Sequence, residues 1–348
     1  MKPHLLLALA GLLVPLAWSG PADATADYTA ETGLCLNGNL PCRTLTGQTT
    51  YVPVRYDVQY SNSPAAATFH VSRPVVTGTN PNLSPATGIT SADGFAAANG
   101  AGVHASATAS SQAIIPANDY AYDPGGSLLG QGSTDTIAAY ALATWTIYDV
   151  IVTGPSTPSG VIAAALNLHL DGTIDGDPVA SGGSGPFAAV ENDLQVLVYA
   201  AGTYATGRYH QVQVANANGV NAPSITTSGL LNGLGTTMGR VTTPTFNVPI
   251  GTPFSVTLDL LAQSRVAIQA TTGSTDANVL AHAATDFGDT FGFDTQGPVF
   301  TISAPGYTAS SVDGGILDDM AVVPEPGSLL LMGLGLAGLV AVSGRREA

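Results

Sequence analysis

Lysine is nearly absent from this 348-residue chain, and charged residues of all kinds make up only 9% of it. The segment 25–324 contains no lysine, 6 arginines and 21 acidic residues, a balance of −15. Nucleic acids and anionic lipid surfaces bind proteins through clustered cations. The composition therefore argues against both partners. It suits a protein that is kept soluble outside the cell, or one that collects divalent cations diffusely.

Glutamate and lysine, two charged residues that favour long helices, are also scarce. Gly, Ala and Thr are the commonest residues instead. The hydrophobic content of 45% excludes wholesale disorder, because disordered chains combine low hydrophobicity with high charge. Small residues at this density are poor for long helices and acceptable in closely apposed sheets. We therefore expect an all-β protein.

Long apolar runs are confined to the two ends. The first run, 5–18, follows a short positive start and precedes small residues at Ala22 and Ala24. This three-part pattern is typical of a secretory signal peptide, and the run is short for a permanent anchor. We expect signal peptidase to remove residues 1–24, with Ala26 as the second choice of cleavage position.

The second apolar run, 329–342, follows the motif Pro324-Glu325-Pro326 and precedes Arg345 and Arg346. Its 14 residues would rise about 21 Å as a helix, less than the roughly 30 Å of a hydrocarbon core. Such a transmembrane helix is marginal and suits temporary holding. The arginine pair would stay in the cytoplasm as a stop, leaving everything before the motif outside.

The order of these three parts resembles the PEP-CTERM sorting signal of bacteria that possess an exosortase. The resemblance covers residues 323–348, and it implies that Pro324-Glu325-Pro326 is recognised and that the tail is cut nearby. It implies transient anchoring in the inner membrane and then delivery to the cell surface or the extracellular matrix, often alongside exopolysaccharide and biofilm. It implies no enzymatic activity for the delivered domain.

The two cysteines, Cys35 and Cys42, lie close together in the sequence near the expected mature N-terminus. In an exported chain such a pair favours a disulfide that closes a small loop. A metal pair is the alternative, but two thiolates without a nearby histidine make only half a zinc site. We place this loop in an extended leader, residues 25–48.

Period-two alternation indicates strands along most of the segment 49–318. The expected extended runs are 51–60, 68–76, 103–115, 137–153, 161–170, 187–200, 207–216, 240–250, 254–270, 279–287 and 298–302. Turn residues separate them, including Asp171-Gly172, and the segment 77–102 reads as a long loop. About ten short strands predict an antiparallel two-sheet sandwich, jelly-roll-like in type.

The core of this sandwich is expected on the apolar faces of the strands. Trp145 and Ile147 alternate with polar residues as they would in a central strand. The alternation favours a core role for Trp145 over a platform on which a sugar stacks. The expected core residues are Val54, Tyr56, Val58, Trp145, Ile147, Leu166, Leu168, Leu170, Val196, Val198, Val256, Leu258 and Leu260.

Four blocks of the C-terminal third, 251–256, 281–290, 297–300 and 305–308, together with 166–173, resemble a sandwich ectodomain often found on PEP-CTERM proteins. That ectodomain has no characterised function. The resemblance therefore implies architecture and nothing about activity.

The densest acidic cluster contains Asp171, Asp175 and Asp177. Three carboxylates in a Gly-rich turn could surround Ca²⁺, which takes six to eight oxygen ligands. The spacing is not that of an EF-hand loop, and a solvated hairpin turn is the plainer interpretation. We therefore expect no bound metal or cofactor, with Ca²⁺ as the alternative.

Catalytic patterns are weak throughout. The histidines of the expected domain are scattered, one per strand, and no G-x-S-x-G elbow marks a nucleophilic serine. His169 and Asp171 could share a strand face, but one such pair is more often a surface contact. Glu31 and Glu191 are the only glutamates between the signal peptide and the sorting motif. Because Glu31 falls in the expected leader, a catalytic glutamate pair is not expected.

The sequence therefore predicts a non-enzymatic exported surface or matrix protein. A carbohydrate-binding module is the first alternative, because jelly-roll sandwiches commonly carry sugar sites. A secreted glycoside-acting enzyme is the second. Exposed aromatic residues aligned on one face would favour the module; the candidates are Tyr120, Tyr122, Tyr204 and Tyr209.

Overall fold

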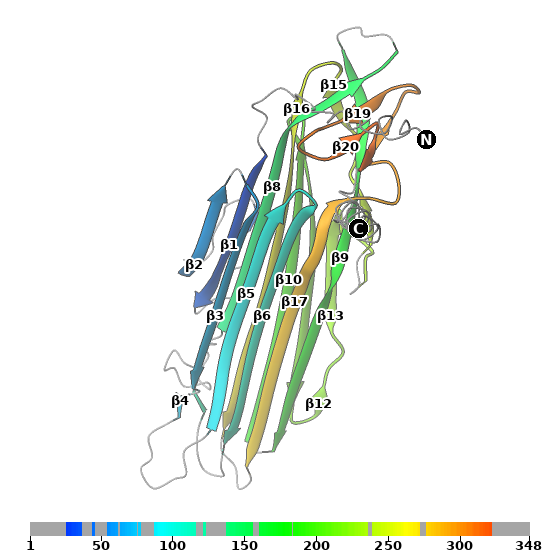
Figure 1. Ribbon diagram of the computed structural model, residues 1–348. Coiled ribbons are helices and arrows are strands. Elements are labelled where there is room, and N and C mark those ends of the chain that lie inside the picture. Colours follow the sequence, from blue (N-terminus) through cyan, green and yellow to red (C-terminus); the bar gives the residue numbers. More distant parts are fainter. Residues whose placement is uncertain are drawn as a thin grey trace, which may run out of the picture.

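The computed structural model describes a chain built from long antiparallel strands and turns (Figure 1). The described residues are 26–36, 44–45, 54–61, 63–74, 76–77, 87–115, 121–122, 137–155, 160–182, 184–235, 239–271 and 276–321. Within these ranges no helix is present that is long and apolar enough to cross a membrane.

Sheet A has nine strands, and its main order is β12-β11-β10-β16-β8-β1-β2. Strand β13 pairs with β11, and β19 pairs with β8. The bounds are β1 Asp27–Leu36, β2 Val54–Ser61, β8 Ile137–Thr153, β10 Ser184–Ala200, β11 Thr203–Asn216, β12 Gly219–Val220, β13 Ser224–Gly229, β16 Phe254–Thr271 and β19 Thr308–Ser310.

Sheet B has eight strands, in the main order β14-β9-β17-β6-β5-β3, with β15 and β18 also paired with β9. The bounds are β3 Ala65–Pro74, β5 Thr87–Asn99, β6 Gly102–Ile115, β9 Val161–Gly182, β14 Arg240–Thr242, β15 Phe246–Pro249, β17 Ala277–Phe293 and β18 Phe300–Ile302. Two short pairs complete the described strands: β4 Val76–Thr77 with β7 Ala121–Tyr122, and β20 Ile316–Leu317 with β21 Met320–Ala321.

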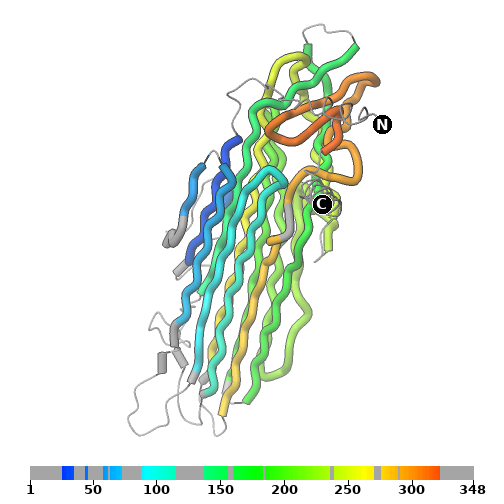
Figure 2. Tube along the Cα trace, in the orientation of Figure 1, coloured from blue at the N-terminus to red at the C-terminus, as the bar shows by residue number. Residues whose placement is uncertain are grey.

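The two sheets stack face to face, so the expected antiparallel two-sheet architecture is confirmed, while the jelly-roll order stays a prediction. The strands are much longer than expected. Strand β9 has 22 residues, about 73 Å at 3.3 Å per residue, whereas typical strands have 3–10 residues. The molecule is correspondingly elongated along the strand direction (Figure 2).

The core between the sheets changes in character along the strands. The inward residues of β8 are small at Ala139, Ala141 and Ala143, and large further along at Trp145 and Ile147. Small inward residues let the two backbones approach closely, whereas rings fill a wider space. The ring of Trp145 lies 5.3 Å from that of Phe293, centroid to centroid.

Ten of the expected core residues are buried in the structure, which confirms the alternation argument for them. They are Trp145, Ile147, Leu166, Leu168, Leu170, Val196, Val198, Val256, Leu258 and Leu260. Val58 is only half-buried. The side chains of Val54 and Tyr56 lie outside the described residues.

The segment 77–102 is not one long loop, because residues 87–99 form strand β5. Its inward residues include Ala92, Ala96 and Ala98, and the outward residue Ala97 is just as small. The alternation of inward and outward residues therefore produces no alternation in hydropathy along this strand. Gly94 of β5 lies opposite Phe69 of β3. The Phe69 ring packs so closely on Gly94 that a Cβ there would come within 2.3 Å of it.

Two further expectations about elements are wrong. Glu31 does not lie in a leader ahead of the first strand: residues 27–36 themselves form β1, paired between β2 and β8 within sheet A. Asp171-Gly172 is not a turn but part of β9. Here the polar residues point outward at every second position, and Gly172 is buried where Phe287 packs against its backbone.

Candidate functional site

A network of charged side chains lies on the outer face of sheet A. Residues two apart on a strand share a face, so Glu191 and Asp193 of β10 both point outward. Glu191 accepts hydrogen bonds from His210 of β11 (2.8 Å) and from Arg265 of β16 (2.6 Å). Asp193 accepts one from Nε of Arg208 of β11, at 2.5 Å. Three neighbouring strands therefore contribute to one network.

The carboxylate of Asp193 is fully buried and is held by two amides in addition to the arginine. Gln195 donates to it at 2.7 Å and Gln263 at 3.1 Å. Burial raises the pKa of Asp193 above its ordinary value, and the hydrogen bond and charge of Arg208 oppose that rise. Each acid of the network is thus matched to a guanidinium, an arrangement typical of a structural ion network.

The protonation of Glu191 gives this network a testable pH dependence. Burial alone would raise the pKa of Glu191, but the hydrogen bond from His210 and the charge of Arg265 hold it below the ordinary value of 4.5. A lowered carboxyl pKa stabilises the fold above the ordinary value, and that contribution is lost as the pH falls through the lowered one.

We expect Glu191→Gln to lower the free energy of unfolding most at neutral pH. The difference from the unmodified protein should shrink as the pH falls below 4.5, because protonation removes the same charge from Glu191. Urea titrations from neutral pH to well below that value measure the difference. Since other carboxyls titrate in both proteins, their contributions cancel. A difference that stays constant over the whole range contradicts the assignment.

The two glutamates do not form a catalytic pair. Glu31 of β1 accepts a hydrogen bond from the hydroxyl of Tyr140 of β8, at 2.9 Å. It lies opposite Leu142, whereas Glu191 is in register with Arg265 and Ala138. Three strand spacings and four residues along the strand separate the two, about 20 Å. The carboxyl groups of glycosidases lie roughly 5–9.5 Å apart.

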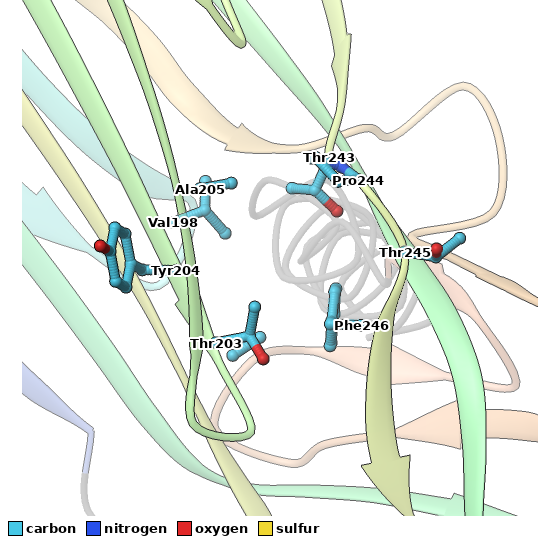
Figure 3. A pocket seen from close by; sticks show the side chains of 9 residues that line it. Val198, Thr203, Tyr204, Ala205, Thr243, Pro244, Thr245 and Phe246 are labelled. Atoms are coloured by element: carbon cyan, nitrogen blue, oxygen red, sulfur yellow. The ribbon is translucent and has the colours of Figure 1, made fainter.

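A shallow pocket with a volume of about 30 Å³ lies between the β10–β11 hairpin and the connection from β14 to β15 (Figure 3). Val198, Ala205 and Phe246 form its apolar wall, and the ring of Tyr204 lies on the other side of the hairpin. The hydroxyl of Thr243 is occupied by the backbone N–H of Leu166, at 2.9 Å. None of the described residues that line the pocket is charged, and its volume is below that of typical small-molecule sites.

The outer face of sheet B places Ser110, His282 and Asp177 side by side on β6, β17 and β9. A catalytic nucleophile needs its base within hydrogen-bond reach, and an oriented base in turn. Among the described contacts no hydrogen bond joins these three side chains. The row therefore has the residue types of a triad without its geometry.

The acidic candidates for Ca²⁺ lie along one strand rather than around one point. Asp171, Asp175 and Asp177 are all exposed on the outer face of β9. Asp171 and Asp177 are six residues apart, about 20 Å in an extended strand. No group of three potential metal ligands occurs among the residues that the structure describes. His169 lies 3.9 Å from Asp171, and the two side chains are 42% and 62% exposed.

An edge position accounts for this acidic row. Beyond Leu170, the side of β9 away from β17 has no paired strand among the described residues. Exposed charges on an edge discourage pairing with another chain. Pro178 fits the same position, because proline lacks the N–H that a strand paired on both sides would use. The edge position therefore explains why Asp171, Asp175 and Asp177 are exposed to solvent, although they lie on a strand and not in the hairpin turn that the sequence predicted.

A buried polar cluster, which the sequence did not indicate, joins the two sheets. Asn192 of β10 accepts a hydrogen bond from Ser264 of β16 (2.8 Å) and donates one to the backbone carbonyl of Asp175 in β9 (2.7 Å). Thr285 of β17 donates to the carbonyl of Gln263, at 2.8 Å. The side chains of Asn192, Ser264 and Thr285 are fully buried. A polar residue that interrupts an apolar face, as Asn192 does between Val190 and Leu194, is the available sequence signal.

Several expected site residues lie outside the described part of the chain. They are Cys42, Pro324, Glu325, Pro326, Arg345 and Arg346, together with the signal peptide and the apolar run 329–342. Of Cys35 the structure describes the backbone, which is part of β1. The predicted disulfide therefore stays a prediction.

Comparison with known proteins concerns the C-terminus. Residues 322–346 match the PEP-CTERM protein-sorting motif. No curated protein and no solved structure matches the chain. The match confirms the resemblance of the tail, and it indicates an exported protein that is sorted and processed by an exosortase.

Proposed function

We propose that this chain is a non-enzymatic protein of the cell surface or extracellular matrix, delivered there through its PEP-CTERM tail. The motif at 322–346 is the observation that carries the proposal. In the sequence it directly follows the last described strand, β21, which ends at Ala321. The ectodomain is thus the part of the chain that is exported, and the tail is its sorting signal.

The construction of the ectodomain supports a binding or scaffolding role. Two sheets of long strands bury a core between them, and the body is elongated along the strands (Figure 2). The acids of the outer network on sheet A are matched to arginines, which supports a structural role for that network. The wide separation of Glu31 from Glu191 disfavours the glycoside-acting alternative.

Fractionation tests the delivery step. The precursor is expressed in a host with an exosortase and in the same host without that gene. We expect the ectodomain outside the inner membrane in the first host and in the inner membrane in the second. The double variant Pro324→Ala/Pro326→Ala should stay in the inner membrane even in the host that has the exosortase.

Glu347→Gln is the matched control, because it changes the tail behind the arginine pair and should leave delivery unchanged. Equal distribution of the unmodified chain in both hosts would refute sorting by the exosortase. Strains that lack the gene for this chain should then be compared for the amount of protein and polysaccharide retained in their matrix.

A further inference from the structure

Aromatic and hydroxyl side chains form a row across the outer face of sheet A, beside the β10–β11 hairpin. The strand registers place one residue of the row on each of five adjacent strands. At about 4.8 Å between strands the row is roughly 19 Å long. We call it the tyrosine strip, and it consists of Tyr204, Tyr199, Thr257, Thr146 and Asp27, with Tyr148 beside Asp27.

The three tyrosines of the strip are unusually exposed for large side chains. Tyr204 is 69% exposed, Tyr148 45% and Tyr199 38%. Tyr199 and Tyr204 lie directly opposite each other on neighbouring strands, so their rings share one face of the sheet. Two strands and two residues place Tyr148 about 12 Å from Tyr199. Exposed aromatic residues that gather on one face mark a binding surface.

The polar groups of the strip are held in place between the rings. The hydroxyl of Tyr148 donates to Asp27 at 2.6 Å. The hydroxyls of Thr146 and Thr257 lie 2.9 Å apart and share one hydrogen bond. Side chains on paired strands that already hydrogen-bond each other lose little freedom when a ligand arrives. Each hydroxyl keeps an acceptor lone pair for that ligand.

This chemistry fits a sugar polymer. The C–H face of a pyranose ring is apolar and slightly positive, and it stacks on the negative face of an aromatic ring. The equatorial hydroxyls of the same sugar donate to and accept from threonine hydroxyls, and they donate to a carboxylate. Alternating rings and hydroxyls along a straight line can therefore follow a single glycan chain over several units.

The charge and shape of the strip narrow the class of partner. The strip contains one carboxylate and no cation, so an anionic polysaccharide would be repelled. A globular protein partner needs a broad patch with a compact apolar centre, usually about 800 Å² on each side. The strip is long and one residue wide on each strand, which matches a chain rather than a globule.

We propose that the tyrosine strip binds a neutral polysaccharide, with Tyr199 and Tyr204 as the stacking residues. The inference rests on the proposed function only in placing the domain outside the cell, where such polymers occur. Asp27 accepts hydrogen bonds from the chain, and the two threonine hydroxyls accept and donate them; together they fix the orientation of the chain.

Affinity electrophoresis of the exported protein tests the proposal. The probes in the gel are hydroxyethylcellulose, galactomannan and laminarin as neutral polymers, and alginate as an anionic one. We expect retardation by at least one neutral polymer and none by alginate. Tyr199→Ala and Tyr204→Ala should each weaken binding about tenfold or more, because truncation of an aromatic anchor removes most of its contact with the ligand. The double variant should abolish the retardation.

Phe95→Ala is the matched control, because Phe95 is 37% exposed on the outer face of sheet B. It should leave binding unchanged, and Tyr199→Phe should keep most of it because the ring remains. Circular dichroism melts check that each variant is folded. The proposal is overturned by retardation in alginate alone, by no retardation in any polymer, or by equal retardation of the double variant. Each of these can occur with normal export, so they are distinguishable from a failure of sorting.

Discussion

Trp145→Ala should destabilise the exported protein by about 3–5 kcal/mol, the range for deletion of a fully buried aromatic side chain. Trp145 is 1% exposed at the point where the core changes from alanines to rings, and it packs against Phe293. The neighbouring inward residues lie on paired strands of both sheets, so they can collapse only partly into the space. Urea denaturation followed by circular dichroism measures the change.

Tyr148→Phe, on the same strand, is the control for this experiment. Its side chain points outward and it loses one exposed hydrogen bond to Asp27, so the change should stay within about 0.5 kcal/mol. A loss below about 1 kcal/mol for Trp145→Ala would mean that the ring does not fill the core. In that case Trp145 would have to be reconsidered as a surface platform, the alternative to its core role.

Asp193→Ala should cause the second large loss in the free energy of unfolding. The substitution removes the acceptor shared by Arg208, Gln195 and Gln263 from a fully buried position. Removing one partner of a buried ion pair costs about 3–5 kcal/mol. Because the Arg208 side chain is 40% exposed, water can solvate its guanidinium afterwards, which reduces the expected loss to about 2–4 kcal/mol.

A double-mutant cycle separates the ion pair from the amide contacts of Asp193. Arg208→Ala in the Asp193→Ala background should cost less than Arg208→Ala alone, because its partner has already gone. Asp177→Ala, an exposed acid on β9, should change stability by less than about 0.5 kcal/mol. Equal effects of the two aspartate substitutions would show that the network contributes nothing.

The all-β class followed from composition and alternation, and most of the core followed from alternation, because Leu, Val and Ile recur at every second position in the long strands. Where both faces of a strand carry small residues, hydropathy loses that signal. Strand β5 was therefore expected to be a loop, and the segment around Asp171 a turn. In the second case the alternation was present as Asp, Thr and Asp outward with Gly and Ile inward, but turn residues concealed it.

The candidate sites could be predicted only in part, because they depend on strand parity and register. Tyr204 and Tyr209 were both candidates for an exposed aromatic face, yet only Tyr204 is exposed, while Tyr209 is fully buried. The two tyrosines are five positions apart, and an odd spacing places them on opposite faces of the strand. The matches of Glu191 to Arg265 and of Tyr199 to Thr257 need the pairing of β10 with β16, which no local pattern specifies.

The mass of the mature protein tests the central claim most directly. The protein is recovered from outside an exosortase-bearing host, and its intact mass is measured together with both terminal peptides. Our account predicts a chain that begins near Thr25 and ends near Pro324, without the arginine pair. An extracellular protein that still carries residues 327–348 would contradict it, as would a full tail found only in the inner membrane.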